Sequence, residues 1–581
     1  MAKTTGVSKT GVQPVDGLLE GVKWADANLT YSFPTQSAFY GSTYGSGEPG
    51  SAFEALNPVQ ITAVESILGM YAATTHLAFT RLEETETQHA DLRFAMSDVP
   101  GTAWAYYPSE SPEGGDTWFN NSTGWYDSPH KGNYAYTTAI HEIGHSLGLK
   151  HAHETEMFGA VPRAYDSMEY TIMSYRSYEG GSTTSGYTNE TWGYAQSLMM
   201  YDIAALQHLY GADFGTNAGD TTYRWDPLTG QSFIDSIGQG APGGNRIFQT
   251  LWDGGGRDTY DFSNYTTNLR VNLSPGEWTI VSDVQRANLG HGQFADGNIA
   301  NALLHQNNPA SLIEDAIGGI GDDVLVGNSA NNALVGGAGR DLLVGSTGSD
   351  ALDGGLGIDT AVFSGSRANY SVVLNADGSF GVQDLRAGSP DGTDVVRGVE
   401  FFQFGDWVLD ASAVVADRMG VATDRTLSGT FKSNTLLGDA RNERLFGFGG
   451  NDSLNGGAGS DQIVGGAGAD MLTGGAGADN FVFESLSDSN ARGRDTILDF
   501  TAGDHIDLRL IDASTQQAGD QAFAYIDSGA FTGHAGQLRF SGGLLSADTN
   551  GDRVADFEVA VRFTAGVTNA VTSLTVSDFY L

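Results

Sequence analysis

The sequence predicts an α+β domain followed by an all-β region, a parallel β-roll with a small β insert. Three observations support this prediction. Over about the first 220 residues, short strand-like segments and three predicted helices indicate a mixed α and β domain. The composition then shifts to Gly, Asp and Asn, and an unbroken nine-residue period runs from Gly318. The period lapses near residue 363 and resumes from Gly438 to Val482, so we expect an insert between two blocks.

Several strands and three helices are predicted in the first domain. Asn57 and Pro58 supply an N-cap and a first-turn proline for a helix whose apolar residues, Ile61 to Tyr71, recur at helical spacing. Further helices are expected over about 137–149 and 200–210, the second closed by Gly211. Residue type and alternation predict strands at Leu29–Phe33, Leu77–Leu82, Ala90–Met96, Ala103–Tyr107 and Thr117–Asn120.

Composition limits the partners. The chain has 29 Lys and Arg against 70 Asp and Glu, a formal charge of −41. This charge repels nucleic acid and anionic membranes, whereas carboxylates are the ligands that calcium prefers. The absence of cysteine excludes disulfides, thiolate zinc ligands and a cysteine-based zymogen latch. No apolar run has the length of a transmembrane helix, and the N-terminus lacks the apolar core of a secretory signal, which taken alone favours the cytoplasm.

The clearest chemistry lies in HEIGHSLGLKH, from His141 to His151. His141 and His145 are four residues apart, so one helix face presents both imidazoles to one metal ion. Gly148 can end the helix in a left-handed turn that returns His151 as a third ligand. Three neutral nitrogens leave one coordination position open, as a catalytic zinc site requires. Glu142 is then placed to take a proton from a water at the metal.

Two alternatives compete with this interpretation. The histidines could belong to an ordinary surface helix, but a chance match that also includes Gly148 and His151 is rare. His153 could replace His151 as third ligand, although the Gly-x-x-His spacing favours His151.

The pattern H-E-x-x-H-x-x-G-x-x-H resembles the metzincin motif, which is accompanied downstream by a methionine turn. The segment MEYTIMSY supplies this turn, with Met173 as its methionine. Tyr175, two residues on, resembles the serralysin tyrosine, which ligates zinc in the resting enzyme and can swing to stabilise the oxyanion. The segments AWAYYP, GGDTWFN and YDIAALQHLYGA are also similar to serralysins, so the resemblance covers nearly the whole chain. One departure is Ala152, where serralysins often have proline.

This resemblance implies an α+β metzincin catalytic domain that hydrolyses proteins or peptides with one zinc ion. Zinc would polarise the scissile carbonyl, and Glu142 would move the proton to the leaving amine. Tyr175 would donate to the oxyanion, a contribution of about 3 kcal/mol. The strand near Ala103–Tyr107 would pair with the substrate as an added strand. A proteinaceous inhibitor is a further expected partner, and a monomer is the expected state.

The repeated unit G-G-x-G-x-D-x-U-x matches the calcium-binding RTX repeat, in which glycines and carbonyls form a turn and the sixth-position carboxylate completes each calcium site. The apolar eighth residue packs inside the roll. A flexible glycine-rich linker is the alternative, but linkers do not keep Asp and Leu in phase over five units. Asn332 and Asn442 are assigned to the acidic position of two degenerate repeats, whose sites should be weak or absent.

The segment WDGGGRDTYDFS also resembles the serralysin calcium site at the domain junction. Several structural calcium ions are therefore expected, held by Gly254, Gly256, Asp258, Gly319, Gly321, Asp323, Gly337, Gly339, Asp341, Asp350, Gly355, Gly357, Asp359, Asp452, Gly457, Gly459, Asp461, Gly466, Gly468, Asp470, Gly475, Gly477 and Asp479. The later segment DTNGDRVAD, Asp548 to Asp556, is either half of a calcium loop or a solvated turn.

The last residues, Ser577–Leu581, resemble the serralysin ending, an acidic residue followed by apolar ones. This ending implies a type I secretion exporter as partner and an extracellular location, since a calcium-dependent roll would stay unfolded until export. A simple terminal strand is the alternative. The predicted domains are 1–20, an N-terminal extension or short pro-segment; 21–240, the zinc metalloprotease domain; 241–362, the junction and first roll block; 363–430, the insert; and 431–581, the second roll block with the export signal.

The resulting hypothesis is a secreted zinc-dependent endopeptidase of serralysin type with a calcium-stabilised roll. The competing hypothesis is a calcium-dependent cell-surface or surface-layer binding protein whose peptidase activity is secondary. The complete set of motif residues favours the enzyme.

Overall fold

The computed structural model describes residues 2–41, 44–406, 408–414, 424–430, 432–439, 441–517, 521–563 and 573–581. The chain forms two compact units, one of residues 1–361 and 374–399 and the other of residues 362–373 and 400–581. Within the described ranges, no helix is both long and apolar enough to cross a membrane. Part of the predicted insert, residues 415–423, lies outside the described residues.

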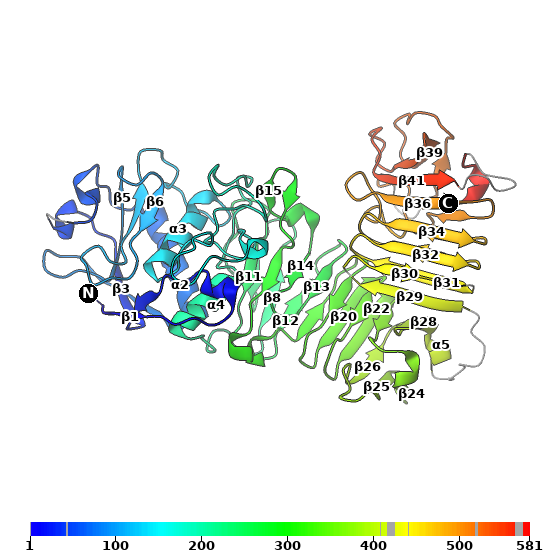
Figure 1. Ribbon diagram of the computed structural model, residues 1–581, viewed down its shortest axis with the longest axis horizontal. Helices are drawn as coiled ribbons and strands as arrows, with labels where there is room; N and C mark the ends of the chain where they lie inside the picture. Colours follow the sequence, from blue (N-terminus) through cyan, green and yellow to red (C-terminus); the bar gives the residue numbers. More distant parts are fainter. Residues whose placement is uncertain are drawn as a thin grey trace. The chain divides into compact units, whose positions relative to one another are not determined.

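The N-terminal part of the first unit has a five-stranded sheet with helices beside it (Figure 1). The order of its strands is β4 (Ala78–Arg81), β3 (Asn28–Ser32), β5 (Leu92–Ser97), β7 (Thr117–Asn120) and β6 (Ala103–Ala105). The helices are α1 (Gln13–Asp16), α2 (Pro58–Thr74), α3 (Tyr134–Ser146) and α4 (Met200–Tyr210). Strand β6 runs antiparallel to β7 and forms an edge of the sheet, whereas the other pairs are parallel. The predicted strands and helices of this domain are all present, with small shifts of their ends.

The helix ends follow from capping chemistry. The Asn57 side chain accepts hydrogen bonds from the amides of Val59 and Gln60, so α2 begins as predicted. Helix α3 begins at Tyr134, three residues before its predicted start, because the Asn133 side chain caps it by accepting from the amide of Tyr136. The hydrophobic pattern alone did not reveal this cap.

Residues 2–20 contact the same domain and are buried there at residues 15–19. Strand β1 (Thr4–Gly6) pairs with β2 (Val22–Trp24) in an antiparallel ribbon. Leu18 and Leu19 are fully buried in the core that also contains the inner faces of α2, α3 and α4. Leu19 forms an antiparallel bridge with Leu149, next to the predicted metal motif. This segment therefore lies against the candidate site.

Beyond α4 the first unit consists of short strands. They are β8 (Thr222–Trp225), β9 (Ser232–Ile234), β10 (Ile237–Gly238), β11 (Gln249–Leu251), β12 (Thr259–Asp261), β13 (Arg270–Asn272), β14 (Trp278–Thr279), β15 (Asn288–Gly290), β16 (Gln293–Phe294), β17 (Ile299–Asn301), β18 (Asp315–Ile317), β19 (Val324–Val326), β20 (Ala333–Gly339), β21 (Leu342–Val344), β22 (Ala351–Gly357), β25 (Phe380–Asp384) and β26 (Thr393–Arg397). The chain alternates between two sheets: β18, β20 and β22 pair in parallel in one, and β19 and β21 pair in parallel in the other. Two nine-residue repeats thus make one turn, and the eighth-position residues Leu325, Leu334, Leu343 and Leu352 are buried between the sheets.

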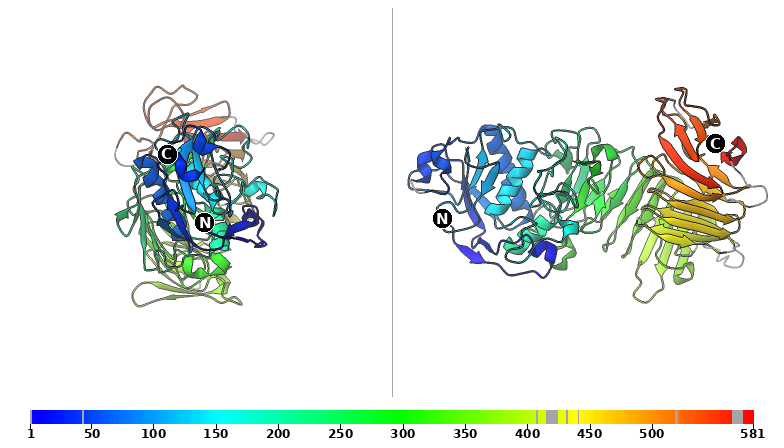
Figure 2. Two further views of the ribbon diagram at one scale, coloured as in Figure 1. Left: turned by 90° about the vertical axis from the view of Figure 1, so that its left-hand side faces the viewer. Right: turned by 45° about the horizontal axis from the view of Figure 1, so that its top comes forward.

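The second unit repeats this arrangement, and Figures 1 and 2 show its strands stacked as successive rungs. One sheet contains β29 (Asp424–Thr430), β31 (Asn442–Phe448), β33 (Gln462–Val464), β35 (Asn480–Val482), β37 (His505–Asp507) and β42 (Phe579–Tyr580). The other contains β30 (Thr435–Leu437), β32 (Ser453–Ala458), β34 (Met471–Ala476), β36 (Asp495–Phe500), β41 (Phe557–Phe563), β40 (Leu544–Asp548), β39 (Gln537–Ser541) and β38 (Ala524–Tyr525). The unit also includes β27 (Phe401–Gln403), β28 (Val408–Asp410) and α5 (Ala411–Val414). The chain passes from the first unit to the second within β23 (Thr360–Val362), returns within β24 (Tyr370–Leu374) and passes to the second unit again between residues 399 and 400.

Two details differ from the sequence analysis. The residue at the acidic position of the degenerate repeat is Glu443, not Asn442, because Arg444 pairs with Gln462 and the amide of Glu443 donates to Asp461 Oδ1. Within the predicted insert, β26 pairs in parallel with β22 and so extends the first block by one strand. The expected turn at Asp377-Gly378 is present, since the Asn375 amide donates to the Ser379 carbonyl.

The chain's last strand also bears on an alternative raised above. Strand β42 pairs with β37, with Ile506 opposite Phe579. The final residues therefore form a terminal strand, which is compatible with a role as an export signal but does not support it.

Candidate metal centre and active site

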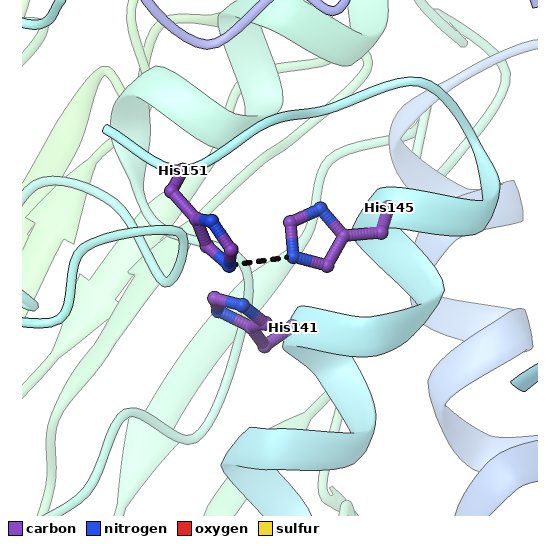
Figure 3. Close-up of side chains that lie close together, drawn as sticks. All are labelled: His141, His145 and His151. Atoms are coloured by element: carbon purple, nitrogen blue, oxygen red, sulfur yellow. Dashed lines mark hydrogen bonds between the residues drawn. The ribbon is translucent and has the colours of Figure 1, made fainter. Parts of the chain in front are cut away.

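The three motif histidines converge although they come from two segments (Figure 3). His141 and His145 lie on one face of α3, one turn apart, and both are buried. His151 lies beyond the end of the helix and points back toward them. One ligand atom from each histidine lies within 4.8 Å of the others, a spacing that could hold a metal ion. His153 does not belong to this group, although its ring lies 5.6 Å from that of His151.

The turn at Gly148 returns His151 to the site. Gly148 has φ +103°, a conformation that side-chain-bearing residues rarely adopt. A Cβ atom added there would also lie 2.4 Å from the carbonyl oxygen of Val22. The Leu149 amide donates to the Gly144 carbonyl, which ends α3. Only glycine therefore suits the position that the sequence motif assigns to it.

Hydrogen bonds orient each imidazole. Nδ1 of His141 lies 2.7 Å from the carbonyl oxygen of Ile172, and Nδ1 of His145 lies 2.7 Å from that of Leu149. Nδ1 of His151 lies 2.7 Å from Oε1 of Glu154. These acceptors place a proton on every Nδ1 and leave the Nε2 lone pairs for a metal, as in many histidine-ligated sites.

The donor set fits a zinc ion. Nε2 of His145 and Nε2 of His151 are only 2.9 Å apart, an approach of two lone pairs that a cation between them would stabilise (Figure 3). Burial lowers the pKa of His141 to about 4 and that of His151 to about 2, and holds the pKa of His145 well below its ordinary value. The imidazoles are therefore neutral at physiological pH, which is the form that binds metals.

Two further predicted residues lie beside the histidines. The hydroxyl of Tyr175 is 2.8 Å from His151 Nε2, so it could reach a metal there. Burial, then the charge of Glu142, raises the pKa of Tyr175 to about 12, so its hydroxyl remains a donor. Glu142 is itself buried, and its burial raises its pKa to about 8, opposed by a hydrogen bond from the backbone of Ala105. A carboxyl group in such surroundings is more basic than usual.

The methionine turn packs beneath α3. Met173 is fully buried, and its sulfur would lie 2.9 Å from a Cβ atom added at Gly144, so a small residue is needed on that face of the helix. The carbonyl of Met173 accepts a hydrogen bond from the amide of Ala152. A proline at position 152 would lack this amide, so the departure from the usual serralysin residue here adds a link between the two loops.

Asp202 is a supporting residue that the sequence analysis did not identify. This fully buried carboxylate accepts hydrogen bonds from the Thr171 hydroxyl at 2.5 Å and the Ile172 amide at 2.8 Å. It also accepts from the amide of Met199 at the start of α4. Asp202 thus holds the methionine turn to α4. An acidic residue in the first turn of a predicted helix was the available signal, but it is also an ordinary capping feature.

A cleft of about 760 Å³ opens beside the metal centre. Its walls include His141, Glu142 and Tyr175, together with Thr102 and Ala103 at the edge strand β6. The remaining wall is uncharged and combines polar threonine and asparagine side chains with four aromatic ones, Trp125, Tyr134, Tyr187 and Tyr194. An extended peptide can add to the free edge of β6 by main-chain hydrogen bonds. The cleft therefore has the size and chemistry to bind a peptide across the metal centre.

The predicted calcium residues form a second type of candidate metal site. In each block, Oδ1 of a sixth-position carboxylate accepts a hydrogen bond from the backbone amide of the residue eighteen positions earlier. Asp341 accepts from the amide of Asp323, Asp359 from that of Asp341, Asp470 from that of Asp452, and Asp479 from that of Asp461. We call this series the acidic ladder. Asp394, Asp495 and Asp504 extend it, although the sequence analysis missed them because their spacing departs from nine residues.

The second oxygen of many ladder carboxylates accepts no hydrogen bond from the described part of the chain; these oxygens belong to Asp341, Asp350, Asp452, Asp461, Asp470, Asp479 and Asp495. Main-chain carbonyls lie close by: a Cβ atom added at Gly447 would lie 2.4 Å from both Asp452 Oδ2 and the Gly465 oxygen. Buried oxygens without donors, next to carbonyls, are suitable ligands for a hard cation.

The other predicted calcium positions differ in how far protein hydrogen bonds already satisfy their side chains. Asp258 Oδ2, at the predicted junction site, has the same lack of a donor. Both oxygens of Asp323 accept backbone amides, from Leu269 and Gly319. Asn332 donates from its amide to the carbonyl of Glu314, so this degenerate position is satisfied without a cation.

Steric crowding explains why glycine recurs at fixed positions of the repeats. Gly339 has φ +134°, and a Cβ atom there would lie 2.3 Å from the carbonyl oxygen of Gly321, one turn earlier. Successive turns therefore approach too closely for a side chain, and the other predicted glycines of the repeats follow the same pattern. The segment Asp548–Asp556 differs, because Asp548, Asp552 and Asp556 all accept backbone amides in a self-bonded turn.

The histidine triad, the adjacent glutamate and the methionine turn define a metal site of the metzincin class. Comparison with known proteins agrees. The family described as "Peptidase M10 serralysin C terminal" matches residues 212–377 and 432–570, and the family described as "Matrixin" matches residues 23–171. The chain belongs to the serralysin-type M10 metallopeptidases. Membership of this family implies a catalytic zinc ion.

Curated relatives support this assignment. Metalloprotease AprA of Pseudomonas entomophila is 33% identical over 337 residues, covering 55% of this chain and 63% of its own length. Serralysin B of Dickeya chrysanthemi is 35% identical over 316 residues, covering 52% and 58%. Serralysin of Proteus mirabilis is 31% identical over 330 residues, covering 53% and 61%. The chain thus spans about three fifths of the length of the curated relatives it matches.

Proposed function

We propose that this protein is a zinc-dependent endopeptidase that cleaves proteins or peptides bound along β6. The observation that carries the proposal is the triad itself: two buried imidazoles and the half-buried imidazole of His151, each with Nδ1 held by an acceptor, present Nε2 toward one point beside Glu142. His141, His145 and His151 would hold the zinc ion, and Tyr175 lies within reach of it. A binding protein without catalysis would not need Glu142 in this buried position.

The mechanism follows from these residues. When bound, zinc supplies Lewis-acid polarisation of the scissile carbonyl and activates water. Glu142 accepts the proton of the attacking water and returns it to the leaving amine. The Tyr175 hydroxyl donates to the oxyanion that develops on the carbonyl oxygen. Strand β6 orients the peptide, and the aromatic wall of the cleft binds a side chain next to the scissile bond.

A casein zymogram with the purified protein tests this proposal. We expect a clear band of hydrolysis that disappears with a zinc-selective chelator and returns when zinc is restored. A zinc-loaded, folded protein that cleaves no protein or peptide substrate would contradict the proposal and favour the surface-binding hypothesis.

We also propose that the acidic ladder is an RTX β-roll that binds several calcium ions. The carboxylate oxygens without donors and their neighbouring carbonyls support this assignment. With it we retain the predicted domain division: an extension at 1–20, the peptidase domain at 21–240, roll blocks at 241–362 and 431–581, and an intervening insert at 363–430. Glu443, which occupies the acidic position that the sequence analysis gave to Asn442, is added to the proposed calcium ligands.

Export through a type I secretion exporter, an extracellular location, a monomeric state and regulation by a proteinaceous inhibitor remain proposals from the family resemblance. Export is the most readily tested of these. In a host with a cognate exporter, deletion of the last 50 to 60 residues should trap the protein inside intact cells. Appearance of the truncated protein in the medium without lysis would refute a C-terminal signal.

A further inference from the structure

Lys150, immediately before the third histidine, is fully buried. Its ammonium group donates to three main-chain carbonyl oxygens: Gly17 at 2.8 Å, Glu154 at 2.7 Å and Gly159 at 3.1 Å. A lysine ammonium has three N–H donors and no acceptor, so these carbonyls use its whole donor capacity. A buried charge without such partners would be strongly destabilising. The geometry therefore indicates a specific role rather than a chance burial.

The surroundings of Lys150 also compensate its charge. Burial lowers its pKa, but the carboxylates of Glu154, Glu20 and Glu156 favour the charged form. The sequence motif places no requirement on this position, which lies between the glycine and the third histidine. A lysine here is thus a feature of this chain, supported by residues distant in the sequence.

The three carbonyls connect separate segments at the metal centre. Gly17 follows α1, whereas Glu154 and Gly159 lie in the loop that follows His151. Main-chain hydrogen bonds reinforce the same junction, because the Lys150 amide donates to the Leu18 carbonyl and the Glu20 amide donates to the Gly148 carbonyl. Lys150 thus joins the N-terminal segment to the loop on the far side of His151.

Glu154 links this junction to the metal ligand. Its carbonyl accepts from the Lys150 ammonium, and its carboxylate Oε1 lies 2.7 Å from His151 Nδ1. The Glu154 amide also donates to the His151 carbonyl. Main-chain and side-chain contacts of one residue therefore hold both the loop and the ring of His151. Partners of this kind typically change metal affinity about 10- to 100-fold when they are removed.

We propose that Lys150 is a positioning residue that fixes His151 for metal binding by holding Glu154 in place. The inference rests on the proposed function, since it concerns the same zinc centre. Lys150 contacts neither the substrate nor the reacting atoms, so its effect is on zinc affinity and not on the chemical step.

The test measures the zinc dissociation constant by competition with a chromophoric chelator, at saturating calcium, for the full-length protein. Lys150→Met keeps an unbranched apolar side chain close to the length of the lysine stem but removes the ammonium group and its three donors. We expect it to weaken zinc binding about 10- to 100-fold, with KM for a peptide substrate unchanged once zinc saturates. Lys131→Met is the matched control, because Lys131 also donates to a main-chain carbonyl, that of Gln239, but contacts none of the His151 loop.

A double-mutant cycle tests the route through Glu154. Glu154→Ala should also weaken zinc binding, and Lys150→Met combined with Glu154→Ala should be little worse than the stronger single variant. Glu154→Gln retains an oxygen acceptor for His151 Nδ1, so it should recover most of the affinity. If Lys150→Met does not fold, the comparison of Glu154→Ala with Glu154→Gln still tests the link.

The outcomes are distinct. Zinc affinity within twofold of wild type for Lys150→Met, fully additive effects in the cycle, or equal affinities of Glu154→Ala and Glu154→Gln would overturn the inference. A wild-type protein that binds no zinc would instead contradict the proposed function itself.

Discussion

The histidine centre and the acidic ladder are prepared for a cation in opposite ways. At the centre, three neutral imidazoles are oriented by hydrogen bonds to Ile172, Leu149 and Glu154. In the ladder, carboxylates are stacked at every turn, and one oxygen of many of them faces no donor in the described structure. The centre is therefore organised by the fold, whereas the ladder needs an external positive charge.

The pKa values express the same contrast. Burial, followed by the charges of neighbouring aspartates, raises the pKa of Asp341 to about 8. The same causes raise the pKa of Asp495 to about 9. The ionised ladder is thus costly without a counterion, whereas the histidines are already in their uncharged, metal-binding form. The comparison shows that the two kinds of site should respond differently when their metals are removed.

Calcium withdrawal should have the largest effect. We expect a calcium chelator to abolish most of the β-structure of residues beyond about 318 and make them sensitive to proteases, because repulsion among carboxylates opposes folding. Circular dichroism and limited proteolysis measure the loss, with half-maximal recovery at about 10⁻⁴ to 10⁻³ M calcium. A zinc-selective chelator is the control and should leave the spectrum nearly unchanged. An unaltered spectrum without calcium would refute the roll assignment.

Tyr175→Phe tests the histidine centre with a smaller change. Removing the hydroxyl that lies 2.8 Å from His151 Nε2 should lower kcat by about one to three orders of magnitude. KM should change less, because the hydroxyl acts on the transition state. Steady-state kinetics at measured zinc occupancy provides the test. An unchanged kcat would remove Tyr175 from the mechanism.

Asn332→Asp probes the ladder with the smallest expected effect. The Asn332 side-chain amide donates a hydrogen bond to the carbonyl of Glu314. An ionised aspartate has no proton to donate, so the substitution removes this bond. We expect a loss of about 1–3 kcal/mol in the free energy of unfolding at saturating calcium. Asn331→Asp is the control. Asn331 is exposed, and its side-chain oxygen accepts a hydrogen bond from the Ser349 amide, which a carboxylate can accept equally well. A calcium-dependent gain in stability would mean that position 332 is a latent cation site.

Much of the site could be predicted from sequence because its residues are local. His141, His145, Gly148 and His151 act through helical spacing and one turn, which the sequence expresses directly. The helix start at Tyr134 was predicted three residues late because apolar periodicity does not register a cap such as Asn133.

The residues that were missed depend on contacts between distant segments. Lys150 reaches Gly17, and Asp202 reaches Ile172, through hydrogen bonds that no spacing in the sequence reveals. Asp394 and Asp495 join the ladder after insertions that break the nine-residue count. The assignment of Asn442 was wrong by one position, since Glu443 is the residue that aligns with Asp461.

Glu142→Ala provides the most direct test of zinc-dependent hydrolysis. Glu142 is adjacent to a ligand in the sequence but is assigned as the base, so removing its carboxylate should leave metal binding and fold intact. The measurement is peptidase activity together with zinc content for the wild-type and variant proteins. We predict one zinc ion per chain in both, with less than a few per cent of wild-type activity in the variant. Substantial activity in zinc-loaded Glu142→Ala would contradict the account.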